Sequence, residues 1–202
     1  MSVSKSIVTV IFIVDTSGSM CGQKIESVNA AVAECLGVLR KYQTGNENLM
    51  TGFLTFDEKA GDLVWERDGG AAVFKVKPKS NGFYSMTSFS CLYEGLYAVL
   101  RECQTDRLCL FLITDGRPTD SGEYADALEK VKSLEVFRRA DRYVVLSGND
   151  TGGIGNDVLE FVGFQADKII HLSDLSGCMA KVQMLTADDG GNKARYESIF
   201  GD

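Results

Sequence analysis

Short apolar segments alternate along this chain with longer segments whose apolar residues recur every three or four positions. Residues 7–14 and 108–114 are nearly all apolar, while residues 23–41 carry the helical spacing. Strands buried in a parallel sheet are apolar throughout, and the helices that cover such a sheet have one apolar face. The alternation predicts an α/β, Rossmann-like fold with a mostly parallel central sheet of about six strands and helices on both faces.

The remaining elements follow from the same pattern. Residues 62–66 are expected to pair with a strand at 50–57 as an antiparallel edge. A third helix is predicted to begin after Pro118, with Asp120 as its N-cap and Glu123 completing a capping box. The other expected elements are strands at 143–146 and 168–172, a further short strand at 72–76, and helices at 90–102, 156–162 and 174–185.

The length of 202 residues fits one α/β domain, and no internal repeat or linker divides the chain. We therefore expect a single domain over residues 1–186. Residues 187–202 are rich in Gly and Asp, which predicts a poorly ordered C-terminal tail.

Charge and hydropathy limit the partners. A formal net charge of −7 argues against nucleic acid, because phosphate contacts need a basic face. Arg138, Arg139 and Arg142 form the single basic cluster, which we interpret as a solvated helix end. No stretch reaches the ~18 consecutive apolar residues of a membrane helix, and no cleavage-site pattern follows the first apolar run. We expect a cytoplasmic protein with no membrane partner.

The cysteines are scattered and form no CxxC pair, and most of them fall on apolar positions of expected helices or strands. This placement predicts reduced thiols in the core rather than a disulfide framework or a zinc site. The six residues are Cys21, Cys35, Cys91, Cys103, Cys109 and Cys178.

A loop rich in oxygen-bearing side chains follows the first apolar segment directly. Asp15, Ser17 and Ser19 alternate with small residues there, so their side chains can converge as the chain turns. In open α/β sheets, ligands bind beyond the carboxyl ends of the strands, which is where this loop lies. One carboxylate with two hydroxyls suits a hard cation better than zinc, which prefers thiolate and imidazole.

A second carboxylate stands at the matching place in the chain. The apolar segment 108–114 ends at Asp115, and Gly116 allows a close approach of the backbone. Between the two acidic positions, Thr87 lies in a hydroxyl-rich loop just before an expected helix. The candidate metal ligands are Asp15, Ser17, Ser19, Thr87 and Asp115.

These motifs, in this order, resemble the metal-ion-dependent adhesion site (MIDAS) of von Willebrand factor A domains. The pattern comprises Asp15-x-Ser17-x-Ser19, a later Thr before a helix, and the segment Ile-Thr-Asp-Gly-Arg-Pro at 113–118. The likeness covers about residues 6–186. Residues 22–29 and 54–57 resemble in particular the stand-alone bacterial proteins of the tellurium-resistance TerY type.

The resemblance implies how the site is used. Ser17, Ser19 and Thr87 would bind Mg²⁺ directly, with Mn²⁺ or Ca²⁺ as alternatives, and Asp15 and Asp115 would hold it through water. One coordination position would remain for a Glu or Asp of a protein partner. The implied protein is a binding module, not an enzyme, in a bacterial or phage stress-response complex that includes a kinase or a metal-dependent phosphatase.

One departure affects the third hydroxyl. The family usually has glycines just before its Thr, whereas Ser85 and Met86 stand there in this chain. Ser85, Ser88 or Ser90 could therefore replace Thr87 as the ligand.

Two other functions compete with the binding module. A haloacid-dehalogenase-type phosphotransferase also has an Asp after its first strand, but it needs a second acid where this chain has Ser17. A scaffold protein with a purely structural metal would use the same ligands. Asp57 and Asp62 are interpreted as solvated turn residues, the Gly-rich residues 151–155 as a connection without the Lys-Ser/Thr of a phosphate loop, and His171 as structural.

Overall fold

A computed structural model describes residues 7–43, 49–66, 75–76, 85–116, 118–148 and 155–178. Its centre is a six-stranded sheet in the order β3-β2-β1-β4-β5-β6, in which β3 is antiparallel to β2 and all other neighbours are parallel. The expected fold class, including the antiparallel edge, is confirmed. The strands are β1 (Val8–Asp15), β2 (Leu49–Phe56), β3 (Val64–Trp65), β4 (Arg107–Thr114), β5 (Asp141–Leu146) and β6 (Ile169–His171).

Strand β1 occupies the middle of the sheet, and all eight of its residues are buried. It pairs with β2 on one side and with β4 on the other, so that Val14 lies between Thr55 and Ile113. Because the three strands run in the same direction and end in register, the residues that follow them meet at one edge of the sheet. This register brings the Asp15 loop and Asp115 together.

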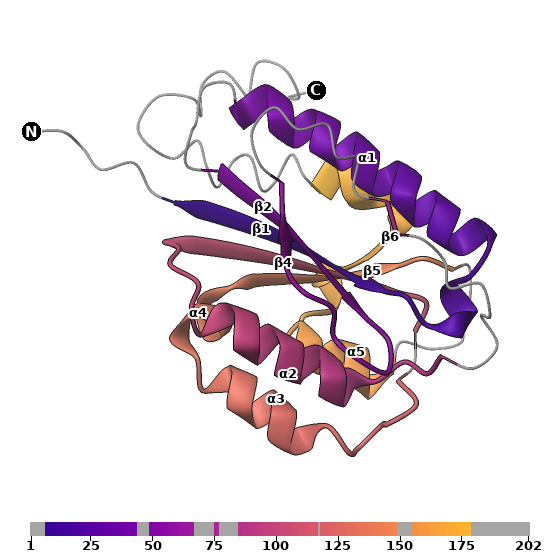
Figure 1. Ribbon diagram of the computed structural model, residues 1–202, viewed down its shortest axis with the longest axis vertical. Helices are drawn as coiled ribbons and strands as arrows, with labels where there is room; N and C mark the ends of the chain where they lie inside the picture. Colours follow the sequence, from indigo (N-terminus) through magenta and orange to yellow (C-terminus); the bar gives the residue numbers. More distant parts are fainter. Residues whose placement is uncertain are drawn as a thin grey trace, which may run out of the picture.

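The helices form two layers, one on each face of the sheet (Figure 1). Successive side chains of β1 pack on opposite faces of the sheet. Phe12 belongs to the core under α1, and Ile11 and Ile13 belong to the core under α2 and α3. The helices are α1 (Gln23–Gln43), α2 (Phe89–Leu100), α3 (Ala125–Lys132), α4 (Glu135–Arg139) and α5 (Asn156–Phe161), with short 3-10 helices η1 (Gly18–Met20), η2 (Ala166–Lys168) and η3 (Leu172–Asp174).

The prediction of the third helix start is wrong. Helix α3 begins at Ala125, five residues after the proposed N-cap Asp120. The carboxylate of Asp120 instead accepts hydrogen bonds from the N–H groups of Phe89 and Ser90, both at 2.9 Å, and from the Ser88 hydroxyl at 2.8 Å. Asp120 therefore supplements Ser88, the N-cap residue of α2, by accepting from the first two N–H groups of that helix. These partners lie about thirty residues away in sequence, and a local capping rule does not consider them.

Parts of the other expectations fall outside the described residues, namely the tail at 187–202 and most of the strand at 72–76. Of the last expected helix, at 174–185, residues 174–178 are described: Asp174 ends η3, and residues 175–178 are helical. The single domain over 1–186 stays a prediction. Among the described helices, none has both the length and the apolar character needed to cross a bilayer.

All six cysteines are free thiols, and Cys35, Cys109 and Cys178 are buried. Burial raises the pKa of Cys35 and of Cys109 to about 12, which keeps both protonated at neutral pH. These two thiols are therefore core side chains rather than reactive groups.

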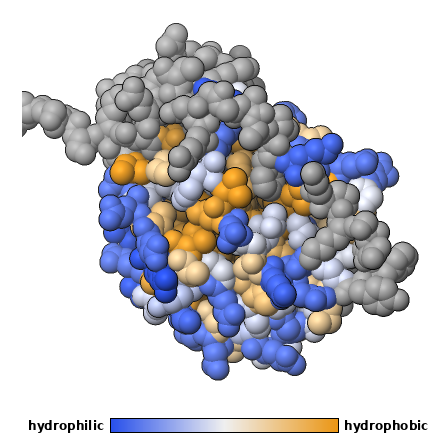
Figure 2. All heavy atoms as spheres, in the orientation of Figure 1, coloured by the Kyte–Doolittle hydropathy of each residue, from blue (hydrophilic) through white to orange (hydrophobic). Residues whose placement is uncertain are grey.

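Apolar residues gather at the centre of the face seen in Figure 2, with hydrophilic residues around them. At the β3 edge of the sheet, Met50 and Val64 are 41% and 57% exposed. The edge strand itself is only two residues long. So short a strand presents little free backbone for pairing with another chain.

Candidate metal site

Asp15, the last residue of β1, is fully buried. The Ser17 N–H donates to its Oδ1 at 2.9 Å, and the Thr114 hydroxyl donates to its Oδ2 at 2.7 Å. Burial raises the pKa of Asp15, and the nearby Asp115 carboxylate adds to this, although these hydrogen bonds oppose the shift. Both donors are neutral, so they leave the negative charge of an ionised Asp15 uncompensated. A cation beside Asp15 would therefore stabilise its ionised form.

The two serines of the loop lie next to each other and next to Asp115. After Ser17 the chain enters η1, and this turn brings the Ser17 and Ser19 Oγ atoms within 3.2 Å. The Ser19 hydroxyl donates to Asp115 Oδ1 at 3.0 Å, across 96 positions of sequence. The structure thus joins Ser17, Ser19 and Asp115 in one continuous chain of contacts.

Asp115 follows β4 directly and has a second partner. Its Oδ2 accepts from the Lys24 ammonium at 2.6 Å. Gly116 then adopts φ of +144°, a conformation that side chains rarely allow, and its N–H donates to the Thr114 hydroxyl at 3.3 Å. The sequence interpretation did not single out Lys24, because a place at the start of a helix after the serine loop does not by itself indicate a contact with Asp115.

Thr87 is 5% exposed and precedes α2 at the same edge of the sheet. Its carbonyl accepts from the Thr119 N–H at 2.8 Å and from the Thr119 hydroxyl at 3.0 Å. Two residues earlier, the Ser85 carbonyl accepts from the Gly18 N–H at 3.0 Å. This bond holds the Thr87 loop against the serine loop.

The alternatives to Thr87 are not equally placed. The Ser88 hydroxyl donates to Asp120, and the Ser90 hydroxyl also bonds to Asp120. The Ser85 hydroxyl is buried without a hydrogen-bond partner in the described part of the chain. Thr87 and Ser85 are therefore the two remaining candidates for the third hydroxyl.

The interpretation of Asp57 as a solvated turn residue is wrong, because this residue is only 4% exposed. Its carboxylate accepts from the Thr16 hydroxyl at 3.2 Å and from the Lys59 N–H at 3.1 Å. Its carbonyl accepts from the Ser88 N–H at 3.1 Å. Asp57 thus connects the Asp15 loop with the segment that follows Thr87, whereas Asp62 is exposed as expected.

The other candidates are not part of the contacts at this site. His171 is exposed at the end of β6, three strands from β1 along the same edge of the sheet, and residues 151–154 lie outside the described ranges. Arg142 is not a solvated helix end: it is half-buried and donates to the carbonyls of Phe137 and Phe161, both at 2.6 Å.

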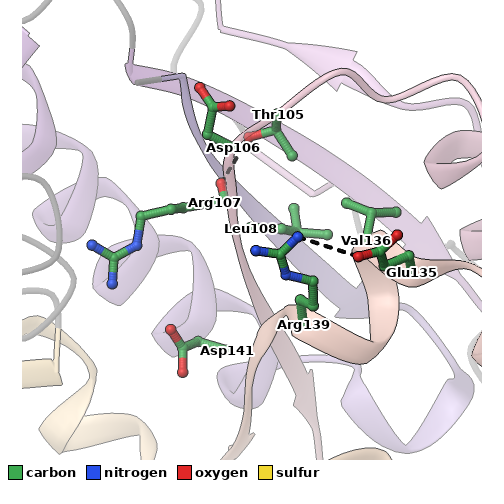
Figure 3. A pocket seen from close by; sticks show the side chains of 8 residues that line it. All are labelled: Thr105, Asp106, Arg107, Leu108, Glu135, Val136, Arg139 and Asp141. Carbon is green, nitrogen blue, oxygen red and sulfur yellow. Dashed lines mark hydrogen bonds and ion pairs between the residues drawn. The ribbon is translucent and has the colours of Figure 1, made fainter. Parts of the chain in front are cut away.

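A cavity of about 440 Å³, whose lining side chains are drawn in Figure 3, lies at the end of the sheet opposite to the candidate metal site. It opens beside the first residues of β4 and β5, whereas Asp15 and Asp115 follow the last residues of β1 and β4. The cavity is thus separate from the candidate metal site. Its lining is mostly polar and comprises Thr105, Asp106, Arg107, Leu108, Glu135, Val136, Arg139 and Asp141.

The donors at the strand ends are all oxygens. Within the described ranges, no group of three or more His, Cys, Asp or Glu side chains is placed to hold a metal. The site offers two carboxylates supplemented by hydroxyls, a set that fits a hard cation and not a zinc centre of the thiolate or imidazole type. The buried carboxylate of Asp15 and the paired hydroxyls of Ser17 and Ser19 fit such an ion.

Comparison with known proteins gives likeness in structure only. No family model and no curated protein sequence matches the chain. Proximal thread matrix protein 1 from the mussel byssus has a TM-score of 0.61 at 16% identity, over 90% of this chain and 46% of that one. The pilus adhesin SpaC from Lactobacillus rhamnosus GG has a TM-score of 0.62 at 13% identity, over 92% of this chain and 30% of that one.

The PilB minor pilin from Streptococcus sanguinis has a TM-score of 0.62 at 11% identity, over 92% of this chain and 62% of that one. A further structure of the mussel protein is described with a zinc-occupied MIDAS motif. This chain spans less than half the length of the mussel protein and of SpaC. At these identities the likeness concerns the fold, and the chain has a von Willebrand factor A-like fold.

Proposed function

We propose that this chain is a metal-dependent binding module. Mg²⁺ would be bound directly by the hydroxyls of Ser17, Ser19 and Thr87, with Asp15 and Asp115 holding it through water. The observation that carries the proposal is the contact chain Ser17–Ser19–Asp115, which joins two loops at the carboxyl edge of the sheet. A metal without a carboxylate in its inner shell stays strongly electrophilic toward an anion, so a Glu or Asp of a protein partner is the ligand we propose.

The structural neighbours support this class of function. Two of them are a pilus adhesin and a minor pilin, and a third is described with a metal in its MIDAS motif. The geometry gives less support to catalysis, because the one serine hydroxyl that donates to a site carboxylate, that of Ser19 to Asp115, belongs to a proposed metal ligand. Ser17 also stands where a phosphotransferase of the dehalogenase type needs its second acid.

The biological system in which the protein works is also part of the proposal. The likeness of residues 22–29 and 54–57 to TerY-type proteins supports a role in a bacterial or phage stress-response complex in the cytoplasm. A kinase or a metal-dependent phosphatase of the same system is then a reasonable partner to test first. Neither nucleic acid nor a membrane surface is expected as a partner.

The test compares wild type with Ser17→Ala, using Ser173→Ala as a control at an exposed serine outside the site. Calorimetry should show one Mg²⁺ site in wild type and in Ser173→Ala and weak or no binding in Ser17→Ala. Capture of proteins from the native lysate should require both Mg²⁺ and Ser17, and chelator should abolish it.

Two outcomes separate the competing functions. If Ser17→Ala mainly lowers the free energy of unfolding in the presence of Mg²⁺, the metal is structural and the protein is a scaffold. If the wild type hydrolyses a generic phosphate ester with Mg²⁺ and Asp15→Ala abolishes the turnover, the protein is an enzyme.

A further inference from the structure

Lys24 contacts the candidate site from an unusual position. It is the second residue of α1, and a cation in the first turn of a helix is opposed by the helix dipole. Its ammonium nevertheless lies 2.6 Å from Asp115 Oδ2, with the Lys24 side chain 40% exposed and that of Asp115 11% exposed. The ion pair, and not the stability of α1, therefore accounts for a lysine at this place.

The two oxygens of Asp115 are divided between two partners. Oδ1 accepts from Ser19, a proposed metal ligand, and Oδ2 accepts from Lys24. With Oδ2 held by the ammonium, Asp115 can turn only Oδ1 toward a metal next to Ser19. Lys24 is thus placed to prevent Asp115 from chelating the ion with both oxygens.

We propose that Lys24 sets the affinity of the site for an anionic partner, an inference that rests on the proposed function. Asp15 and Asp115, the two carboxylates proposed to hold the metal, together balance the charge of a divalent cation, so the ion and these two groups alone would be neutral. Lys24 adds one positive charge within contact distance of Asp115. A single carboxylate neutralises this surplus, which makes a monoanionic carboxylate the ligand class that the charges favour.

This role predicts opposite effects on two affinities. The ammonium repels a metal ion, because both are cations, and attracts the incoming carboxylate. Replacing Lys24 by a neutral residue should therefore tighten metal binding and weaken carboxylate binding. If Lys24 only held the fold together, its replacement would lower both affinities. If Lys24 had no role at the site, its replacement would change neither.

The experiment uses Mn²⁺ and acetate as probes at constant ionic strength. Mn²⁺ affinity is measured by calorimetry, and acetate binding by the fall in water-proton relaxation when acetate displaces a Mn²⁺-bound water. The variants are Lys24→Gln, Lys24→Arg, which keeps the charge, and Lys132→Gln as a matched control. Lys132 is also 40% exposed and is also paired with one carboxylate, that of Glu129.

We expect Lys24→Gln to bind Mn²⁺ about threefold more tightly and acetate about three- to tenfold more weakly than wild type. Lys24→Arg and Lys132→Gln should stay close to wild type in both measurements. Normal Mn²⁺ binding with unchanged acetate affinity in Lys24→Gln, or a loss of both affinities, contradicts this inference alone. Absence of Mn²⁺ binding in wild type contradicts the proposed function, and the inference fails with it.

Discussion

The hydroxyl of Thr114, at the end of β4, donates a 2.7 Å hydrogen bond to the carboxylate of Asp15, at the end of β1. Both side chains are fully buried, and 99 positions of sequence separate them. The bond fixes Asp15 Oδ2, while the Ser17 N–H holds Oδ1. The strand pairing of the sheet therefore orients the carboxylate that we propose lies behind the metal.

Replacing Thr114 by Val removes this donor at nearly constant volume. We expect the free energy of unfolding to fall by about 1–3 kcal/mol, because a buried carboxylate oxygen loses its partner. Mg²⁺ affinity should fall as well, since Asp15 is no longer oriented. Chemical denaturation and calorimetry measure the two effects.

Thr51→Val is the matched control for Thr114→Val. Thr51 is also a fully buried strand threonine, but its hydroxyl has no hydrogen-bond partner within the described residues. Its replacement should leave Mg²⁺ affinity unchanged and should not lower stability. Equal effects of the two variants would show that Thr114 has no special relation to Asp15.

Thr87→Val and Ser85→Ala distinguish the two candidates for the third hydroxyl ligand. Thr87 is 5% exposed, so Val should keep the fold while removing one direct metal ligand. We expect Mg²⁺ affinity to fall about tenfold or more in Thr87→Val, on the order of 1.4 kcal/mol or more, and to change little in Ser85→Ala. The reverse ranking in calorimetry would assign the ligand to Ser85.

As pH is lowered, Mg²⁺ affinity should begin to fall at a higher pH than it would if Asp15 had the ordinary pKa of an aspartate. Burial raises the pKa of Asp15, so the native state retains this proton above the ordinary value of 3.8. Between the two pKa values the folded protein binds more protons than the unfolded one, and ionisation of Asp15 lowers stability as pH rises. Mg²⁺ must displace that proton, and calorimetry between pH 4 and pH 8 tests this. An affinity that stays constant down to about pH 4 would contradict it.

Asp120→Ala should destabilise the protein by about 1–2 kcal/mol at neutral pH. The N–H groups of Phe89 and Ser90 lose their acceptor, although Ser88 still caps α2 through the Cys91 N–H. Burial alone would raise the pKa of Asp120, but the hydrogen bonds from Ser90, Phe89 and Ser88 hold it below its ordinary value. The stabilisation by a carboxylate of lowered pKa is present above the unfolded-state pKa and is lost as pH falls through the folded-state pKa. Denaturation at pH 7 and pH 3 measures the difference.

Asp126→Ala serves as the control for Asp120→Ala, since Asp126 is an exposed aspartate in the first turn of α3. Its removal should change stability by less than about 1 kcal/mol. A loss as large as that of Asp120→Ala would mean that the cap on α2 is not the source of the effect.

Periodicity predicted most of the fold, because a parallel sheet leaves a strong local signature. The apolar segments at 7–14 and 108–114 are β1 and β4, and the edge strand at 62–66 contains β3 in the antiparallel pairing expected for it. The errors concern side chains whose partners are distant in sequence. Asp120 caps α2 instead of α3, and Asp57 is buried between two loops rather than solvated.

The candidate site was predictable in part for the same reason. Asp15, Ser17, Ser19 and Asp115 follow strand ends, so the order of the elements alone indicates that they converge. Lys24 lies on a helix and reaches Asp115 across 91 positions of sequence. No rule of spacing indicates which surface lysine does so, and this contact required the three-dimensional structure.

The most direct test of the metal site is a crystal structure of the protein with Mn²⁺, read from the anomalous signal. We expect one Mn²⁺ peak between the hydroxyl oxygens of Ser17, Ser19 and Thr87, with a water or another small ligand in one remaining position. A peak elsewhere, or an ion whose remaining position is filled by the backbone of this chain, would rule out the proposed adhesion-type site.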